Sequence, residues 1–384
     1  MEWLKQAAKA CYSQLVRFVS RRAVRDKLSK EIVYLMSFPS NNQGLIEALH
    51  RDYPVTVMYT SDCRQEAEAL AKQQVSILPL DNPFVFFWQC VPLMTRSRVV
   101  ICDNYFPFLG YLQKHSDAVF VQIWHATGAI KTFGYEDRQL KHRTKKDLAR
   151  FTSVYQSFDY YVVASKQMAD VFQRSYGARE EQMLYFGLPR TDQFVQLRKA
   201  QTEQQDQTAD HKKVIVYTPT YREGQTELPL LDIPKMAKEL GDSYRLIVRL
   251  HPHVQKLADK VPHTPFVSWD GHLQPTAQLL ETADLLITDY SSVVFDYTLL
   301  KQRASVIYFW YDREQYEEKT GLQPHLTELL NGPVVATTEE LIAAVKTHVP
   351  TNQEQFNRLW NTYNDGAATA RFVTYVHQLM DGMI

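Results

Sequence analysis

Short apolar runs alternate with stretches of helical spacing along most of this 384-residue chain. Strands that alternate with helices predict parallel sheets built from βαβ units. The expected strands are Ile32–Ser37, Val55–Tyr59, Val99–Cys102, Val119–Trp124, Tyr160–Ala164, Met183–Phe186, Val214–Tyr217, Arg245–Leu250, Leu285–Thr288 and Val306–Phe309.

A polar, Gln-rich stretch from Gln196 to Lys213 divides these strands into two series and contains no Phe, Trp or Tyr. A chain of this length suits two domains better than one. We therefore predict an α/β protein with two doubly wound, Rossmann-like domains that face a cleft. The expected division is a basic N-terminal helix over 1–30, a first domain over 31–200, and a second domain over 201–384 that includes a C-terminal helix.

The composition excludes several classes of protein. Lys plus Arg and Asp plus Glu both number 43, so the chain lacks the basic field of a general nucleic-acid binder. Its four cysteines have neither metal-ligand nor redox-pair spacing, which fits a reducing compartment. No apolar stretch approaches the roughly 20 residues of a transmembrane helix, and the first 30 residues lack the apolar core of a signal peptide. We expect a soluble or peripheral protein of the cytoplasm.

The first 30 residues carry eight basic side chains against Glu2 and Asp26. Two interpretations stay open: a helix that lies in an anionic membrane surface, or a helix packed on its own domain with a solvated basic face. The membrane interpretation assigns one apolar stripe to Leu4, Ala8, Cys11, Leu15, Phe18 and Val19.

In open parallel sheets, ligands bind beyond the carboxyl ends of the strands. His125 is the first residue after the predicted strand 119–124, and a neutral imidazole there can take a proton from an alcohol. The alternative is a histidine packed in the cleft wall. Asp103 also follows a strand of the first domain and is a second candidate base. Lys131 and a basic run follow His125, namely Arg138, Lys141, His142, Arg143, Lys145 and Lys146.

Cations follow two predicted strands of the second domain. Arg222 lies in the loop after strand 214–217, where a guanidinium suits phosphate, although an ion pair with a nearby carboxylate is the alternative. Strand alternation places Arg249 and His251 on one face, either as anion ligands or as solvated side chains. The spacing of His251 and His253 suggests a metal, but no clear third and fourth ligands accompany the pair.

The motif ITDYSSVVFDY carries the strongest signal in the second domain. A buried strand runs into Asp289, and Ser291 or Ser292 then caps a helix that contains Asp296. The exposed amides of a first helical turn together with a hydroxyl form a phosphate site. Ordinary capping explains one serine, but explains less well why the same turn also carries two aspartates.

Together, the segments WHATGAIKTFG, YTPTYRE, RLHPH and ITDYSSVVFDY resemble the CDP-glycerol glycerophosphotransferase family of teichoic acid synthesis. The resemblance includes GLPRTD and YNDG and spans about residues 95–370. It implies a two-domain fold of the glycosyltransferase B type and the transfer of phosphoglycerol with release of CMP. The short chain, its basic start, the segment ICDNYF and the Ala-Thr-Gly after His125 resemble the primase branch more than the polymerases.

The resemblance implies a primase that adds the first glycerol phosphate to the N-acetylmannosamine of an undecaprenyl-diphosphate-linked disaccharide, as a peripheral enzyme on the cytoplasmic face of an anionic membrane. The alternatives are a poly(glycerol phosphate) polymerase, a fold-related nucleotide-sugar glycosyltransferase or epimerase, and a non-catalytic membrane scaffold. The scaffold would not need histidines and phosphate-type loops at four strand ends.

Under this hypothesis His125 is the general base, with Asp103 as the alternative, and His251 stabilises the pyrophosphate with Arg222 and the start of the serine-containing helix. Asp289 orients a histidine or Arg222, and Asp296 holds the glycerol hydroxyls. No cofactor is required; Mg²⁺ stays open as an alternative, although the sequence contains no evident ligand cluster for it. The donor side is expected to comprise Arg222, Arg249, Ser291, Ser292, Asp289, Asp296, Thr218, Asp365 and Gly366. The acceptor or lipid side is expected to comprise Lys131, Asn104 and Arg138.

Overall fold

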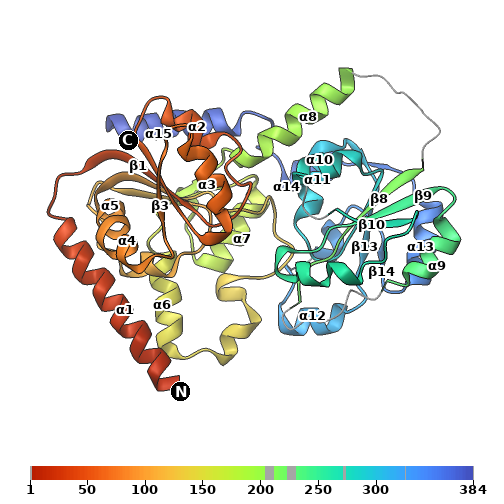
Figure 1. Cartoon of the computed structure of the whole chain (residues 1–384), viewed down its shortest axis with the longest axis horizontal. Helices are drawn as coiled ribbons and strands as arrows, with labels where there is room; N and C mark the ends of the chain where they lie inside the picture. Colours follow the sequence, from red (N-terminus) through yellow and green to blue (C-terminus); the bar gives the residue numbers. More distant parts are fainter. Residues whose placement is uncertain (1, 204–211, 223–230, 271–273, 325, 384) are drawn as a thin grey trace. The chain divides into compact units, whose positions relative to one another are not determined.

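The computed structural model describes residues 2–203, 212–222, 231–270, 274–324 and 326–383. The chain forms two compact units, which the colours of Figure 1 follow along the sequence. Unit 1 comprises Met1–His125, Leu140–Asp192 and Ala367–Ile384, whereas unit 2 comprises Ala126–Gln139 and Gln193–Gly366. Neither unit is a continuous stretch of chain.

Unit 1 is built on a seven-stranded sheet in the order β3-β2-β1-β4-β5-β6-β7, and its strand pairs are parallel. All five residues of β2 are buried, as expected for a parallel strand covered on both faces. The first strand lies beside the fourth, so the switch point of this doubly wound sheet lies between β1 and β4. The strands are β1 (Ser29–Met36), β2 (Val55–Tyr59), β3 (Ser76–Pro79), β4 (Ser97–Cys102), β5 (Val119–Gln122), β6 (Tyr160–Val162) and β7 (Met183–Leu184).

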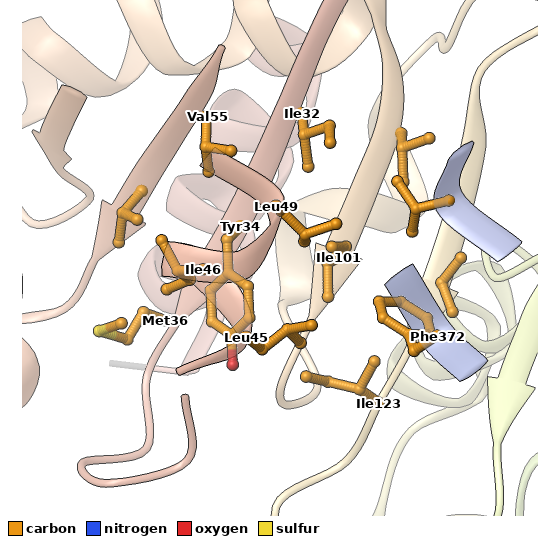
Figure 2. Packing of buried hydrophobic residues seen from close by; sticks show 14 of the residues in the cluster. Ile32, Tyr34, Met36, Leu45, Ile46, Leu49, Val55, Ile101, Ile123 and Phe372 are labelled. Carbon is orange, nitrogen blue, oxygen red and sulfur yellow. The ribbon is translucent and has the colours of Figure 1, made fainter. Parts of the chain in front are cut away.

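Helices bury the apolar side chains of this sheet. Figure 2 shows Leu45 and Leu49 of one helix and Phe372 of another packed with Ile32 and Ile101 of the strands. The helical elements of unit 1 are α1 (Glu2–Ala23), α2 (Leu45–His50), α3 (Arg64–Ala71), α4 (Pro83–Val85), the π-helical turn η2 (Phe86–Cys90), α5 (Val91–Arg96), η3 (Pro107–Tyr111), α6 (Lys145–Tyr155), α7 (Lys166–Tyr176) and α15 (Ala368–Asp381).

Unit 2 repeats the same winding in a six-stranded parallel sheet of order β10-β9-β8-β11-β13-β14. Along β8, Val214 and Val216 join one apolar cluster while Ile215 and Tyr217 join another, because successive side chains point to opposite faces. The switch point lies between β8 and β11. The strands are β8 (Lys213–Thr218), β9 (Tyr244–Val248), β10 (Val267–Trp269), β11 (Leu285–Thr288), β13 (Val306–Phe309) and β14 (Val334–Val335), with β12 (Arg303–Ala304) and β15 (Thr351–Asn352) forming a separate antiparallel pair.

Helices also cover this second sheet. The N-cap of α9 is Asp232, whose carboxylate accepts a hydrogen bond from the amide of Lys235, and α13 begins with a capping box between Thr337 and Glu340. The helices are α8 (Asp192–Glu203), α9 (Ile233–Leu240), α10 (Thr276–Thr282), α11 (Val293–Leu300), α12 (Arg313–Lys319), α13 (Thr338–Thr347) and α14 (Glu354–Trp360).

The structure differs from the expected domain division at three places. Residues 126–139 belong to unit 2, although the sequence places them inside the first domain. Helix α15 belongs to unit 1, because Phe372, Val376 and Leu379 enter the unit 1 core. The expected linker at 196–213 begins as part of α8, and its residues 204–211 lie outside the described residues.

Helix α1 packs on unit 1 through small and β-branched side chains, and its expected apolar stripe is largely on the other side. Val16, Ser20 and Ala23 are buried, whereas Leu15 and Phe18 are exposed. The hydroxyl of Ser20 donates to the carbonyl of Val16 (2.8 Å), so a polar residue can occupy the packed face. Ala8, Cys11 and Tyr12 are also exposed, while Val19 is buried. Across the described parts of the chain, no helix is both long enough and apolar enough to span a bilayer.

Candidate active site

In unit 1, the loop after β1 is held by the residue that follows β4. The carboxylate of Asp103 is fully buried and accepts hydrogen bonds from the amides of Ser37 (2.8 Å) and Phe38 (2.9 Å). Its other oxygen accepts the hydroxyl of Ser37 (2.9 Å). Burial raises the pKa of Asp103 to about 7, while these hydrogen bonds act in the opposite direction. The carboxylate is therefore a fastening point for the β1 loop.

His125 is half-buried beyond the end of β5, and the main chain of Asp103 forms a hydrogen bond with its ring. Nδ1 lies 2.9 Å from the main-chain oxygen of Asp103. A carbonyl oxygen only accepts, so this hydrogen bond requires the proton on Nδ1 and makes Nε2 the basic nitrogen of the neutral ring. The imidazole stacks on Phe38, with centroids 3.8 Å apart and planes 10° apart, and also contacts the ring of Trp124.

The backbone that presents His125 adopts an unusual conformation. Trp124 has a φ of 59°, in the left-handed region that a bulky residue rarely enters. Asn41 donates to the carbonyl of Trp124 (2.9 Å), and Gln122 accepts from its amide (2.8 Å). The side-chain amide of Gln122 in turn donates to the main-chain carbonyl of Asn104 (2.9 Å). The side chain of Asn104 accepts a hydrogen bond from the main-chain amide of Tyr105. Asn104 thus supports this backbone through Gln122.

In unit 2, the same topological position carries Asp289, directly after β11. It is fully buried and accepts the amide of Thr220 (2.9 Å), in the loop after β8. Arg222 pairs with it at 3.0 Å. The carboxylate therefore fastens a loop, as Asp103 does, but here it has a cationic partner.

Arg222 is held in a fixed orientation by two carboxylates. Its Nε and Nη2 donate to Asp312 (2.8 and 3.1 Å), and Nη1 donates to the carbonyl of Thr220 (2.7 Å). The guanidinium also lies over the rings of Tyr290 and Tyr316. Burial opposes its charge, but the hydrogen bond to Asp312 and the charge of Asp289 raise the pKa of Arg222 above its ordinary value. Arg222 is thus a permanent cation, most of whose donors already have partners.

The two basic side chains after β9 have different surroundings. Arg249 is buried and donates to Asp270 (2.8 Å), Thr276 (2.9 Å) and the carbonyl of Gln274 (2.6 Å). These bonds give Arg249 a role in the fold, which differs from the expected phosphate ligand. His251 is half-buried, and its ring stacks near that of Tyr221 (5.8 Å). The side chain of His253 lies outside those that the structure describes.

Helix α11 begins at Val293, and the predicted serines directly precede it. Ser292 occupies the N-cap position without a side-chain capping bond, and the hydroxyl of Ser291 accepts from the amide of Val293 (3.3 Å). Asp296 is buried and accepts the hydroxyl of Thr127. This contact gives Asp296 a partner in the chain segment that follows His125.

The segment 126–139 is attached to unit 2 by further contacts. A Cβ added to Gly128 would lie 2.6 Å from the ring of Phe295, so only glycine permits this approach. The amide of Thr132 donates to the carbonyl of Gly321 (3.1 Å), and Lys131 forms a β-bridge with Leu322. Lys131, expected on the acceptor side, therefore belongs to unit 2.

Lys131 of this segment interacts electrostatically with the buried ion pair of Asp289 and Arg222. The pKa of Lys131 is lowered, mainly by burial; the negative charge of Asp289 acts against this effect, and the positive charge of Arg222 adds to it. An ammonium influenced by both groups lies near the loop after β8. Arg138, expected on the same side as Lys131, is exposed.

The structure gives local surroundings for three further residues that the sequence assigned to the donor. Thr218 is buried, and its hydroxyl donates to that of Thr288 (3.1 Å) between neighbouring strands. Asp365 is exposed in the turn before α15, and Gly366 adopts a φ of 94° there. Within the described residues, no group of three or more His, Cys, Asp or Glu side chains is arranged to hold a metal ion.

The sequence interpretation missed Phe38, Asn41, Gln122 and Asp312. Phe38 and Asn41 lie in the loop after β1, and nothing in their spacing indicates that they reach residues 124–125. Asp312 follows β13, so the rule that ligands and their supports gather at strand ends could have drawn attention to it.

The chain is similar to several known proteins over most of its length. A family model described as CDP-Glycerol:Poly(glycerophosphate) glycerophosphotransferase matches residues 18–378. The chain is 31% identical over 363 residues to the teichoic acid glycerol-phosphate primase of Bacillus subtilis (strain 168), covering 92% of this chain and 93% of that protein. It is 29% identical to the primase of the same description from Staphylococcus aureus (strain NCTC 8325 / PS 47), covering 97% and 98%.

A solved structure of the wall teichoic acid polymerase TagF superposes with a TM-score of 0.72 at 19% identity, covering 99% of this chain and 97% of that one. At this identity the likeness concerns the fold.

Proposed function

Since the chain belongs to the CDP-glycerol:poly(glycerophosphate) glycerophosphotransferase family, we propose that it is a teichoic acid primase that transfers one sn-glycerol 3-phosphate unit from CDP-glycerol to a lipid-linked disaccharide. The acceptor of this proposal is N-acetylmannosaminyl-N-acetylglucosaminyl undecaprenyl diphosphate. Support for a primase comes from the two primase relatives, which match this chain over nearly their whole length.

In the proposed reaction, the acceptor hydroxyl oxygen attacks the β-phosphorus of CDP-glycerol. The bond from that phosphorus to the bridging oxygen breaks, CMP leaves with the electron pair, and the hydroxyl proton passes to Nε2 of His125. The observation that carries this assignment is the bond from Nδ1 of His125 to the carbonyl of Asp103 (2.9 Å), which makes Nε2 the proton acceptor.

On the donor side, we assign the pyrophosphate to the first turn of α11, with Ser291 and Ser292, and to His251 and Lys131. Backbone amides at a helix start bind phosphate, and fixed cations stabilise the charge that develops in the transition state. Arg222 contributes its permanent charge at the same strand ends, while Asp289 and Asp312 fix its orientation. Mg²⁺ has no assigned ligands in this mechanism.

The test is incubation of the full-length protein with labelled CDP-glycerol and the lipid-linked disaccharide, followed by mass analysis. One added glycerol phosphate per acceptor, with stoichiometric CMP, is expected. His125→Ala is expected to abolish transfer while donor binding survives, and His115→Ala, at a half-buried histidine of the same unit that is not assigned to the site, serves as the matched control. Long chains of product would indicate a polymerase, and transfer by folded His125→Ala would remove the base assignment.

We also propose that the enzyme works as a peripheral protein on the cytoplasmic face of an anionic membrane, with α1 in contact with the lipid. Leu15 and Phe18 are exposed on α1, and Phe84 and Trp88, in the helical segment beside it, are 68% and 61% exposed. Tyr12 of α1 stacks on Phe86 of that segment (5.9 Å), so the two apolar groups are neighbours. Such a group of exposed apolar side chains is typical of an interaction surface.

Basic side chains adjoin this surface. Lys9 and Gln6 of α1 contact Asp147 (3.3 Å) and Arg150 (2.7 Å) at the start of α6. The exposed residues Arg143, Lys145 and Lys146 therefore lie close to the N-terminal half of α1. Each basic residue near anionic lipid contributes about 1 kcal/mol, and the effect fades within a Debye length.

Sedimentation with anionic vesicles tests the contact. Removal of residues 1–25 would also uncover the apolar residues beneath α1, so a double variant Leu15→Ser, Phe18→Ser is the sharper probe. It should bind vesicles more weakly than the wild type, most clearly at high salt, and lose activity on the long-chain lipid but not on a short soluble acceptor. Val349→Ser, at an apolar side chain of unit 2 that is 66% exposed, is the matched control. Equal sedimentation of the two proteins would place the contact elsewhere.

A further inference from the structure

We propose that Asp103 and Phe38 form a positioning brace for His125, and that Asp103 acts through this brace without accepting the substrate proton itself. The brace is defined here as Asp103, the two loop residues Ser37 and Phe38, and the imidazole that they hold. The proposal rests on the role of His125 in the proposed function.

Asp103 anchors the brace because it binds both the loop after β1 and the imidazole of His125. Its carboxylate binds the amides of Ser37 and Phe38, which fixes the start of the loop after β1. Its carbonyl binds Nδ1 of His125. The amide of Asp103 donates to Leu35 in the neighbouring strand (3.3 Å), so the anchor is itself part of the sheet. The loop and the imidazole thus share one attachment to the rigid sheet.

Phe38 completes the brace by contact with the face of the imidazole. The two rings are parallel within 10° at a centroid distance of 3.8 Å, and the amide of Phe38 is one of those held by Asp103. The hydrogen bond fixes the direction of Nδ1, and the stacked ring restricts rotation of the imidazole about that bond. Together, these two contacts determine where Nε2 points.

The same geometry argues against Asp103 as the base. A general base must come within hydrogen-bond distance of the proton that it removes. Both carboxylate oxygens already accept hydrogen bonds from the β1 loop, and the residue has no exposed surface. A substrate hydroxyl could reach this carboxylate only after the loop had moved away.

Substitutions at Phe38 test the brace without disturbing the buried carboxylate. Phe38→Leu should lower kcat by about 10- to 100-fold, because small displacements of a catalytic group have effects of that size. The KM for CDP-glycerol should stay near the wild-type value, because the donor residues belong to unit 2. Phe38→Tyr keeps the stacked ring and should restore most of kcat. Equal kcat in Phe38→Leu and the wild type would overturn the proposal.

Nitrogen NMR of ¹⁵N-histidine-labelled full-length protein gives a readout that does not depend on turnover. The His125 resonances, assigned by their loss in His125→Gln, should show the proton on Nδ1 in the wild type and in Phe38→Tyr. In Phe38→Leu they should shift and broaden, because the imidazole can then rotate about its hydrogen bond to the carbonyl of Asp103. Active His125→Ala would refute the proposed base and leave this spectroscopic test intact, so the two failures can be told apart.

Asp103→Asn separates the positioning role from the rival role as base. A brace predicts that the His125 resonances change together with kcat, whereas a base predicts loss of turnover with unchanged His125 resonances. Ser37→Ala provides a milder test if Asp103→Asn does not fold, because it removes one hydrogen bond and leaves both amide contacts in place. It should shift the His125 resonances in the same direction as Asp103→Asn, and unchanged resonances would count against the brace.

Discussion

The two units place an aspartate at the same topological point and use it differently. Asp103 follows β4 and Asp289 follows β11, in each case the fourth strand of its sheet and the neighbour of the first. Both are fully buried and accept amides from the loop after the first strand. In unit 2, Arg222 and Asp312 complete an ion-pair group around Asp289, whereas Asp103 accepts its hydrogen bonds from two amides and a hydroxyl.

This difference shows how one winding can serve two kinds of chemistry. An aspartate with a cationic partner fixes a guanidinium at a strand end, which suits a phosphate donor. An aspartate bound only by amides and a hydroxyl holds a loop and, through its carbonyl, a histidine. Both aspartates support a neighbouring group, and the identity of that group determines the chemistry.

Removal of the Asp289 carboxylate from unit 2 tests this comparison most directly. Asp289→Ala should lower the free energy of unfolding by about 3–5 kcal/mol, because it leaves buried amides unsatisfied and removes one partner of a buried cation. Urea unfolding followed by circular dichroism measures the change. Asp289→Asn, which keeps the shape, should be less destabilised. A loss below 1 kcal/mol for Asp289→Ala would show that Asp312 alone compensates Arg222.

The second comparison is between Arg222 and His251, two basic side chains that we assign to the phosphate site of unit 2. Arg222→Ala and His251→Ala should each lower kcat/KM by about 100-fold, or about 2.7 kcal/mol in transition-state terms. Only Arg222→Ala should also lower stability, because it leaves Asp289 and Asp312 without their shared cation. Steady-state kinetics and thermal unfolding of both variants measure these effects. Values of kcat/KM within about tenfold of wild type for both would remove them from the phosphate site.

Substitution of Asp103 should change the free energy of unfolding by a smaller amount, and this change should depend on pH. Its pKa is raised to about 7 by burial, with Glu66 adding to the rise. A carboxyl with a raised pKa in the folded state contributes stability that is present below its ordinary pKa and is lost as the pH rises through about 7. Wild-type protein should therefore lose stability relative to Asp103→Asn between pH 5 and pH 8.

Unfolding free energies measured at several pH values check this expectation. Glu66→Gln is the control, because Glu66 also has a raised pKa through burial and could produce part of the same slope. Tyr34, Cys63 and Cys102 face the same region, and burial raises their pKa values. A pH profile that is the same in Asp103→Asn and the wild type would assign the slope to another group.

The smallest expected effect concerns metal removal. EDTA should leave most of the transferase activity, because the positive charges assigned to the donor phosphates belong to side chains. Activity measured with and without the chelator, and after addition of Mg²⁺ or Mn²⁺, tests this. Complete loss that either cation restores would show that Asp289 or Asp296 binds a metal.

Much of the fold could be predicted from the sequence because parallel strands form compact apolar runs. The expected bounds agree with β2, β11 and β13, whereas β3, β10 and β14 were missed because their residues do not form a fully buried apolar run. Several strands end earlier than expected, as β5 does at Gln122, since apolar residues continue past the last ladder bond. Local periodicity therefore identifies strands better than it identifies their ends.

Contacts between distant residues could not be predicted in this way. Thr127 and Asp296 are 169 positions apart, and no pattern in either segment indicates that they meet. Phe38 looks like an ordinary loop residue until its ring is found on His125. The strand-end rule located Asp103, Asp289 and His125, but their partners depend on how loops pack, which a single sequence does not encode in any local pattern.

The return of α15 to unit 1 has a consequence for biosynthesis. Phe372, Val376 and Leu379 belong to the unit 1 core, yet a ribosome makes them after the whole of unit 2. Domains commonly complete their folding in the order of synthesis. Here the unit that begins first is completed last, so the apolar side chains that α15 covers stay exposed while residues 193–366 are translated. During that interval we expect the exposed apolar surface to make the nascent protein a target of chaperones.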